Sequence, residues 1–510
     1  MRKCPGEYRD TFFITIMNCL LLLTFTAVIQ NDKYQVVIGL EVHTQLLTQS
    51  KLFCGDSAAF STDPNTHISP ITLAHPGTLP KMNTKVIEYA VKLGLALNCE
   101  IEQHNYFARK NYFYPDLPKG YQVSQHTTPI CKNGFVNIRI GETERNIRLN
   151  RIHIEEDAGK SLHDVDERYT SLDLNRAGVP LLEIVSEPDM HSSDEAFAYI
   201  TELRKLVTWL GICDGNMEEG SMRCDANISI RLKGETKLGT RVEVKNLNSI
   251  RNVKRAIDVE VQRLIKITEL GKKIIQETRS YDADNNLTFS LRTKEDADDY
   301  RYFPEPDLTP FHVTDDYLQK VKSGLPVLPN ALRKYYTDKL HLSAYDASVI
   351  CDDKEQAEYF EETIKYNSNY KAVANWLLGP VKSHLNDSNS GYKDFTLPPE
   401  KIAALISLVD DGKLNFGIAS SKVFTALLKQ PEKQPLEIAT ELNLIQENDS
   451  SSIELWVDEV IANMPDKVDQ YRSGKKGLIG LFAGEVKKLS KGKADMQIVN
   501  TLLDKKLNNQ

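Results

Sequence analysis

The chain has 510 residues, of which 41% are hydrophobic and 26% are charged, and its formal net charge is −8. These values are typical of soluble globular proteins and exclude a disordered chain and a polytopic membrane protein. The length predicts about two to four domains, and the mild acidity indicates no general affinity for nucleic acids while leaving room for a local basic surface.

Residues 1–33 form an N-terminal extension with an apolar run. The run from Phe12 to Ile29 follows Arg2, Lys3 and Arg9, which is typical of a signal or a short membrane segment. The following TAVIQ is a poor cleavage site. Three interpretations stay open: a true signal, an organelle-targeting leader, and a mis-set translation start.

The first predicted strand is VVIGLEVHTQL, Val36–Leu46. Its alternate residues are apolar, so the other face carries Glu41 and His43, about 7 Å apart at the usual strand rise. A carboxylate and an imidazole that point the same way are candidates for chemistry.

Two segments follow that predict a polar site. The loop KNYFYPDLPKGYQVSQ, Lys110–Gln125, combines cations with aromatic rings that stack on a base or, alternatively, pack the loop onto the sheet. RIHIEEDAGKS, Arg151–Ser161, places three carboxylates in a row. A cation of the Mg²⁺ or Mn²⁺ type would relieve their repulsion; the alternative is a solvated acidic turn.

The next strands add more buried charge. Glu183 lies inside the apolar run PLLEIVS, where it needs a metal, an arginine or hydrogen bonds; a salt bridge is the alternative. MRCDANISIR places Arg223 and Arg231 on one polar strand face, where they are candidates to hold anions. VEVKNLNSI adds Lys245.

Helices are predicted at residues 85–98, 195–211 and 249–270, among the strands. This mixture without strict strand–helix alternation predicts an α+β domain around a largely antiparallel sheet. After about Pro326 the pattern changes to consecutive helices, interrupted by a predicted linker at residues 386–394. A lysine-rich stretch between Arg472 and Lys506 is either an ordinary solvated face or a surface for a phosphate backbone.

Taken in order, several long motifs resemble the GatB/GatE family, which supplies one of the large subunits of the aspartyl/glutamyl-tRNA amidotransferase. They are GLEVH, AHPGTLP, RKNYFYPDLPKGYQ, HIEEDAGKS, DLNRAGVPLLEIVSEPD, MEEGSMRCDANIS, EVKNLNS and DDYRYFPEPDL. The resemblance runs from about Tyr34 to the C-terminus. It implies a catalytic cradle domain at residues 34–322, a helical domain at 323–412 and a helical YqeY-like tail domain at 413–510.

The resemblance also implies an activity, that of a ligase with glutamine as the amido donor. Members of this family use ATP and Mg²⁺ to phosphorylate the side-chain carboxylate of Glu-tRNA(Gln) or Asp-tRNA(Asn), and ammonia then yields the amide. The ammonia comes through a tunnel from a separate amidase subunit, and a small third subunit completes the heterotrimer. We expect a cytoplasmic location without a membrane, or a mitochondrion or plastid if the source is a eukaryote. Whether one or both tRNAs are used stays open.

The expected roles are distributed over the motifs. We expect Mg²⁺ on His43, Glu156 and Glu183, catalysis by Glu41, His43, Glu155 and Arg223, nucleotide contacts from Lys110, Tyr112, Lys119, Arg231 and Lys245, and tRNA contacts from Lys475, Lys476, Lys487, Lys488 and Lys491.

Two rival functions remain at this point. The first is a non-catalytic scaffold that binds tRNA and an amidase, with a purely structural acidic cluster. The second is a stand-alone ligase of the glutamine-synthetase kind, for which free glutamate would suffice. The helical C-terminal half favours a macromolecular substrate over the second rival.

Overall fold

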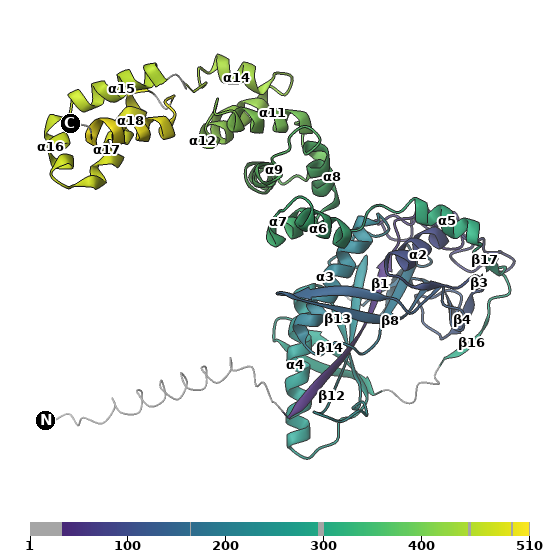
Figure 1. The fold of residues 1–510 in the computed structure, drawn as a ribbon. Coiled ribbons are helices and arrows are strands. Elements are labelled where there is room, and N and C mark those ends of the chain that lie inside the picture. Colours follow the sequence, from purple (N-terminus) through teal and green to yellow (C-terminus); the bar gives the residue numbers. More distant parts are fainter. Residues whose placement is uncertain (1–32, 164, 294–299, 447–449, 491–492, 509–510) are drawn as a thin grey trace, which may run out of the picture. The chain divides into compact units, whose positions relative to one another are not determined.

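The computed structural model describes residues 33–163, 165–293, 300–446, 450–490 and 493–508. The predicted N-terminal extension therefore lies outside the described residues, except for Lys33. The chain divides into two compact units, one ending at Pro326 and the other beginning at Val327 (Figure 1). None of the described helices combines the length and the apolar character needed to cross a membrane.

The first unit is built around one large sheet. Its strand order is β15-β14-β13-β12-β1-β11-β8-β6-β2, and β7 pairs with β8. All these pairs are antiparallel except β13 with β14, so the predicted α+β class with a largely antiparallel sheet is confirmed. The bounds are β1 Tyr34–Gln45, β2 Glu100–Ile101, β6 Cys131–Lys132, β7 Phe135–Ile140, β8 Thr143–Glu156, β11 Pro180–Ser186, β12 Met222–Leu232, β13 Val242–Leu247, β14 Glu277–Asp282 and β15 Leu287–Thr293.

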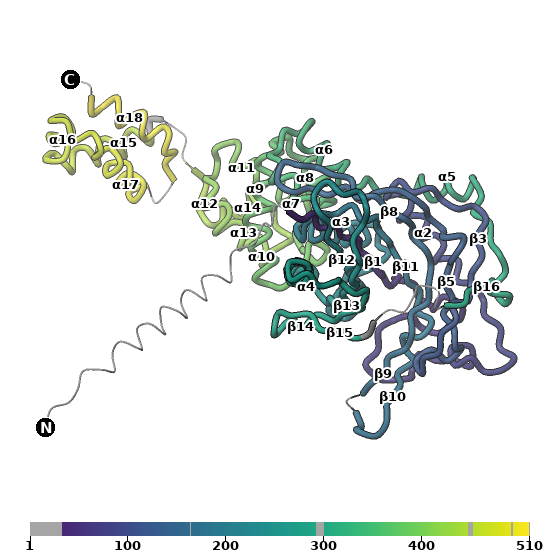
Figure 2. Tube along the Cα trace, turned by 90° about the horizontal axis from the view of Figure 1, so that it is seen from below, coloured from purple at the N-terminus to yellow at the C-terminus, as the bar shows by residue number. Residues whose placement is uncertain are grey.

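Smaller sheets surround the large one. β16, β4 and β5 form a three-stranded sheet, and β9 with β10 and β17 with β3 form two-stranded ones. Figure 2 shows the β9–β10 hairpin projecting from the unit. The bounds are β3 His104–Asn105, β4 Ala108–Asn111, β5 Tyr121–Ser124, β9 Lys160–Leu162, β10 Ser171–Asp173, β16 Arg301–Pro304 and β17 Phe311–His312.

Helices α3 and α4 pack against each other and against the large sheet, α3 on β7 and α4 on β12 and β13 (Figure 1). A serine caps the start of each helix: the hydroxyl of Ser192 accepts from the N–H of Glu195, and that of Ser249 from the N–H of Asn252. The helices of this unit are α2 Thr84–Ala96, α3 Ser193–Trp209, α4 Ile250–Glu269 and α5 Asp315–Ser323.

All the elements described in the second unit are helical, as predicted. They are α6 Pro329–Asp338, α7 Ala344–Ile350, α8 Lys354–Thr363, α9 Tyr370–Trp376, the π-helix η1 Leu377–Val381, α10 Lys382–Asp387, η2 Tyr392–Asp394, α11 Pro399–Asp410, α12 Phe416–Ile418, the π-helix η3 Ala419–Val423, α13 Phe424–Lys429, α14 Pro435–Glu441, α15 Ser450–Ala462, α16 Pro465–Arg472, η4 Lys476–Leu478, α17 Ile479–Leu489 and α18 Met496–Asn508.

The predicted linker at residues 386–394 leads from α10 towards α11, and one of its residues packs into the unit. Tyr392 is buried there, and its hydroxyl donates to the carbonyl of Leu377 at 2.7 Å. One buried aromatic ring thus fixes the connection between α10 and α11. Because its neighbours in the sequence are polar, the burial of this ring is not evident from the sequence.

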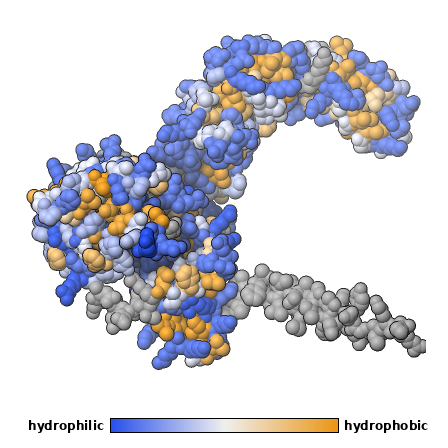
Figure 3. Space-filling model, turned by 180° about the vertical axis from the view of Figure 1, so that it is seen from behind, coloured by the Kyte–Doolittle hydropathy of each residue, from blue (hydrophilic) through white to orange (hydrophobic). Residues whose placement is uncertain are grey.

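The last helices, α15 to α18, have a hydrophobic core of their own. Ile453, Phe482, Val486, Val499 and Leu503 are fully buried in it. Apolar side chains also remain on the molecular surface (Figure 3).

Candidate active site

A row of four side chains crosses β8, β11, β1 and β12 on one face of the large sheet. The strand register places His153 opposite Glu183, Glu183 opposite His43, and His43 opposite Arg223. Side chains in such cross-strand positions lie close enough to interact directly. The row therefore brings two imidazoles to the central carboxylate of Glu183, whose nearest guanidinium is that of Arg151, 3.5 Å from Oε1.

Two more carboxylates join this row. Nε2 of His43 lies 3.3 Å from Oε2 of Glu183 and 3.7 Å from Oε1 of Glu41. Nε2 of His153 lies 3.6 Å from the same oxygen of Glu183 and 3.0 Å from Oε1 of Glu155. We call these five residues the carboxylate–histidine cluster. It contains two possible metal-binding groups that share Glu183.

The charges within the cluster are interdependent. Burial lowers the pKa of His43, but Glu183, Glu41 and Asp225 outweigh burial and raise this pKa to about 9. Burial opposes ionisation of Glu183, yet His153 and His43 hold its pKa well below the usual range. Burial and the charge of Glu183 raise the pKa of Glu41. The cluster is therefore a set of buried charges that are stable only together.

Hydrogen bonds and a lysine support Glu155. Its carboxylate accepts from the hydroxyl of Ser124 at 2.7 Å and from the amide of Gln122 at 3.0 Å, both on β5. Burial lowers the pKa of the Lys110 ammonium, but Glu155, Tyr302 and Glu183 act against burial and raise it overall. Lys110 on β4 therefore stays charged beside the cluster, where it can attract an anionic substrate.

Asp157 anchors Arg223 at the edge of the cluster. Its buried Oδ2 accepts from Arg223 at 2.8 Å and from the amide of Gln45 at 2.7 Å, and Arg176 lies 3.7 Å from Oδ1. Burial raises the pKa of Asp157, but Arg223 and Arg176 outweigh it and keep this pKa low. The guanidinium of Arg223 is thereby oriented next to His43.

A second ion pair lies on the other side of Glu41. Asp225 faces Glu41 across the β1–β12 pair, and its carboxylate forms an ion pair with Lys245 of β13. Lys245 also lies 3.2 Å from Glu243. Lys245 therefore lies close to the cluster, and its expected contact with the nucleotide stays a prediction.

The structure does not bring Glu156 to the cluster, so its expected place beside His43 and Glu183 is corrected. Glu156 follows Glu155 in β8 and so points to the opposite face of the sheet. There it is buried, pairs with Lys119 at 2.7 Å and accepts from the N–H of Val123. Lys119, expected at the nucleotide, is taken up by this pair.

Arg231 is also far from the cluster. It follows Arg223 by eight residues in β12, about 27 Å along an extended strand, and donates to Gln35 and to the carbonyl of Thr236. The alternation of side chains along the strand predicted the face of Arg231 correctly. Arg231 lies, however, at the end of the strand that is far from the cluster.

The sequence analysis assigned no role to His153, and it named Asp157 only as one of the three adjacent carboxylates. Both alternate with Glu155 in HIEED, so strand periodicity would have grouped the three on one face. The prediction treated the adjacent carboxylates as one group and did not apply the alternation to them.

The aromatic loops meet above Lys110. Tyr112 packs edge-on against Tyr114 and Tyr300, and the ammonium of Lys110 lies 5.1 Å from the ring centre of Tyr300. The ring of Tyr112 thus packs against other aromatic rings in the structure. It also lies next to Lys110.

The donor set of the cluster fits a hard divalent cation. Each of its two groups offers two carboxylates and one imidazole, and oxygen-rich sets of this kind favour Mg²⁺ or Mn²⁺ over zinc. His43 carries a proton in the ion-free cluster, and a cation would take the place of that proton.

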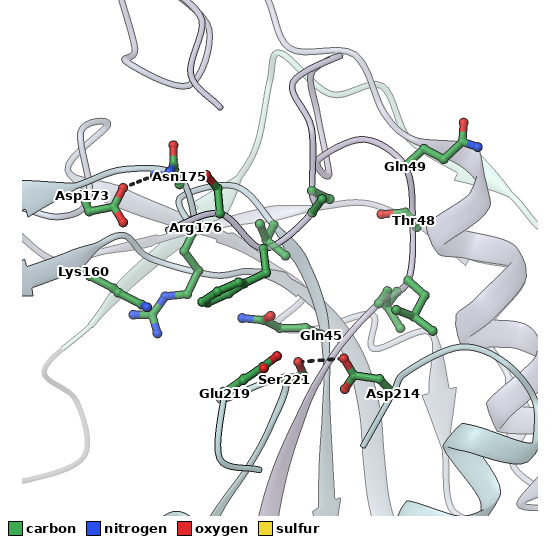
Figure 4. A pocket seen from close by; sticks show the side chains of 17 residues that line it. Gln45, Thr48, Gln49, Lys160, Asp173, Asn175, Arg176, Asp214, Glu219 and Ser221 are labelled. Atoms are coloured by element: carbon green, nitrogen blue, oxygen red, sulfur yellow. Dashed lines mark hydrogen bonds between the residues drawn. The ribbon is translucent and has the colours of Figure 1, made fainter. Parts of the chain in front are cut away.

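A cavity of about 290 Å³ lies beyond the end of β1 (Figure 4). Gln45 lines this cavity and lies two residues from His43 on the same strand face. Figure 4 shows Lys160 and Arg176 on one side and Asp214, Glu219 and Ser221 on another.

The lysines expected at tRNA lie in the second unit. Lys475, Lys476, Lys487 and Lys488 are exposed on and around α17, and Lys491 lies outside the described residues. Lys488 pairs with Glu485, and Lys476 packs over the ring of Tyr471. The charges of Lys475 and Lys487 are therefore more available to a ligand than those of Lys476 and Lys488.

Comparison with known proteins matches both units. Residues 36–319 match the model of the GatB/GatE catalytic domain, and residues 358–507 match the model of a GatB domain. Three similar proteins are each named as the B subunit of an aspartyl/glutamyl-tRNA(Asn/Gln) amidotransferase. They come from Geotalea daltonii (50% identity), Syntrophotalea carbinolica (48%) and Pelodictyon phaeoclathratiforme (50%), and each alignment covers 93% of this chain and 99% of the relative.

Proposed function

The chain belongs to the GatB/GatE family of amidotransferase B subunits, and from this membership we propose that it activates and amidates the side-chain carboxylate of Glu-tRNA(Gln) or Asp-tRNA(Asn). The enzyme class is that of a carbon–nitrogen ligase with glutamine as the amido donor. The observation that carries the proposed mechanism is the carboxylate–histidine cluster, flanked by Arg223 and Lys110.

The proposed first step is phosphorylation by ATP. A side-chain carboxylate oxygen of the aminoacyl group attacks the γ-phosphorus, the bond to the bridging oxygen breaks, and ADP leaves. Arg223, held by Asp157, and Lys110, beside Glu155, stabilise the charge on the phosphoryl oxygens.

The donor set supports Mg²⁺ as the cofactor. Each of the two groups that share Glu183 would hold an ion, one through His43 and the other through His153 and Glu155. Bound Mg²⁺ supplies positive charge that offsets the negative charge of the phosphates.

The proposed second step forms the amide. The lone pair of ammonia attacks the acyl carbon, the bond from this carbon to the phosphate oxygen breaks, and phosphate leaves. The nitrogen then loses a proton, which we assign to Glu41, because its side chain is the most accessible carboxylate of the cluster.

The proposed partners follow from the same family. A separate amidase subunit releases ammonia from glutamine and channels it to this chain, and a small third subunit completes the complex. The exposed lysines around α17 contact the tRNA backbone. We place the reaction in the cytoplasm, as expected for relatives from bacteria.

The test is phosphoryl transfer in the assembled complex. Wild type should transfer label from γ-³²P-ATP to Glu-tRNA(Gln) in an acid-labile form, and Glu183→Gln should abolish the transfer while tRNA still binds. Glu187→Gln is the matched control, because this carboxylate follows the same strand and accepts from Asn150 outside the cluster. Absence of transfer in wild type would favour a non-catalytic scaffold.

A further inference from the structure

The cavity beyond the end of β1 is separate from the carboxylate–histidine cluster, and the function proposed above does not use it. We propose that this cavity binds a nucleotide unit, with its base against Phe60 and its phosphate on Lys160 and Arg176. The inference rests on the proposed function, which supplies two carriers of such a unit, ATP and the 3′ end of aminoacyl-tRNA.

Phe60 and Lys160 form a recognition pair at the cavity. Phe60 is 63% exposed, and the Lys160 ammonium lies 5.5 Å from the centre of its ring. Within the described part of the chain, no carboxylate forms an ion pair with Lys160. An exposed ring beside such a cation suits a base and its phosphate, because stacking and charge act on the same ligand.

Arg176, which also lies 3.7 Å from Oδ1 of Asp157, is a fixed second cation at the cavity. Its Nε and one terminal nitrogen donate to the carbonyls of Ala158 and Gly159 at 2.8 and 2.7 Å. These bonds fix the plane of the guanidinium, and Arg176 lines the cavity together with Lys160 (Figure 4). A rigid guanidinium binds a phosphate with little loss of side-chain entropy.

The opposite wall is acidic and sets the orientation of the ligand, while Asp173, which lines the cavity beside Lys160, accepts from the N–H groups of Asn65 and Asn175. Asp214, which accepts from the hydroxyl of Ser221 at 3.1 Å, and Glu219 both line it. Carboxylates repel a phosphate and accept from ribose hydroxyls, so the two walls prefer different ends of one nucleotide.

Hydrogen bonds preform the cavity. The N–H of His67 donates to Asn175, and the amide of Asn175 donates in turn to the carbonyl of Asp63. Asn65 donates to the carbonyl of Leu172 at 2.9 Å. The loop that carries Phe60 is therefore tied to the β9–β10 hairpin, which carries Lys160, so the two side chains keep their mutual position.

The location connects the cavity with the chemistry. Gln45 lines the cavity, lies about 7 Å along β1 from His43, and donates to Asp157, the anchor of Arg223. A nucleotide bound here would have one end next to the cluster.

The test uses Phe60→Ala and Lys160→Gln in the intact amidotransferase complex. KM is measured separately for ATP and for Glu-tRNA(Gln). Loss of a stacking contact should raise the KM of the bound carrier by roughly tenfold. The matched control is Arg168→Gln with Tyr169→Ala, an exposed cation–ring pair on the same hairpin but outside the cavity.

The outcomes separate the two carriers. A higher KM for tRNA alone assigns the cavity to the 3′ end, and a higher KM for ATP alone assigns it to ATP. If both KM values equal those of the control pair, the inference is overturned while label transfer in wild type still upholds the proposed function. If wild type transfers no label, the proposed function itself fails.

Discussion

Glu183 lies between His43 and His153, and one of its oxygens, Oε2, is 3.3 Å from Nε2 of His43. This arrangement combines a deeply buried carboxylate with an imidazole whose pKa is raised to about 9. Breaking a buried ion pair typically costs about 3–5 kcal/mol. The remaining partners, Glu41 for His43 and His153 for Glu183, reduce this cost.

His43→Ala should abolish metal binding at the group that contains His43, whereas Glu156→Gln should leave binding at both groups intact. Glu156 points to the opposite sheet face and pairs with Lys119. Titration of the complex with Mn²⁺, followed by electron paramagnetic resonance, measures both affinities. Equal losses in the two variants would contradict the assignment of Glu156 to a separate face.

Asp157→Asn should lower kcat for phosphoryl transfer by about 10- to 100-fold, because a neutral amide no longer holds the guanidinium of Arg223 in place. Asp157 acts through Arg223, so the KM for tRNA should stay near the wild-type value. A rise in the KM for tRNA without a loss of kcat would exclude a role of Asp157 in positioning Arg223. Asp189→Asn is the control, since this carboxylate pairs with the exposed Arg148.

Stability in the absence of divalent ions should fall as the pH rises from about 6.5 to 9. The folded state raises the pKa of His43 above its ordinary value of 6.5, so its contribution is complete below the ordinary value and disappears as the pH passes through the folded value. The maximum contribution is about 3 kcal/mol, from about 1.4 kcal/mol per pKa unit.

Denaturant unfolding in EDTA at several pH values measures this effect. In His43→Gln, the decline in the free energy of unfolding between about pH 6.5 and 9 should be smaller than in wild type by about 3 kcal/mol. An unchanged pH profile in the variant would mean that another group causes the decline.

Replacing Lys475 and Lys487 by glutamine should weaken tRNA binding and its dependence on salt. Each lost phosphate contact lowers the slope of log K against log salt by about 0.7–0.9. Filter binding at several salt concentrations gives the slope. Lys413 and Lys433 serve as the control pair, because both already pair with carboxylates, Asp411 and Glu441.

Strand periodicity predicted part of the site correctly. Alternation alone placed Glu41 and His43 on one face, and the structure has them there, 3.7 Å apart. Alternation cannot place a residue along the sheet, and this explains Arg231, which has the expected parity but lies at the far end of β12.

The row of four side chains across the sheet depends on the register between strands, which the sequence of a single strand does not determine. His153 meets Glu183 because of the register between β8 and β11, which results from long-range packing. The three consecutive carboxylates Glu155, Glu156 and Asp157 were expected near each other, but a period of two sends the middle one to the opposite face.

Glu183 also links the occupancies of two ion positions. The groups Glu41–His43–Glu183 and His153–Glu155–Glu183 have this carboxylate in common. An ion in the first group draws electron density from Glu183 and repels an ion in the second. Binding of divalent ions should then deviate from a simple hyperbola and show negative cooperativity, so that the enzyme's response to ion concentration is spread over a wider range than two independent sites would give.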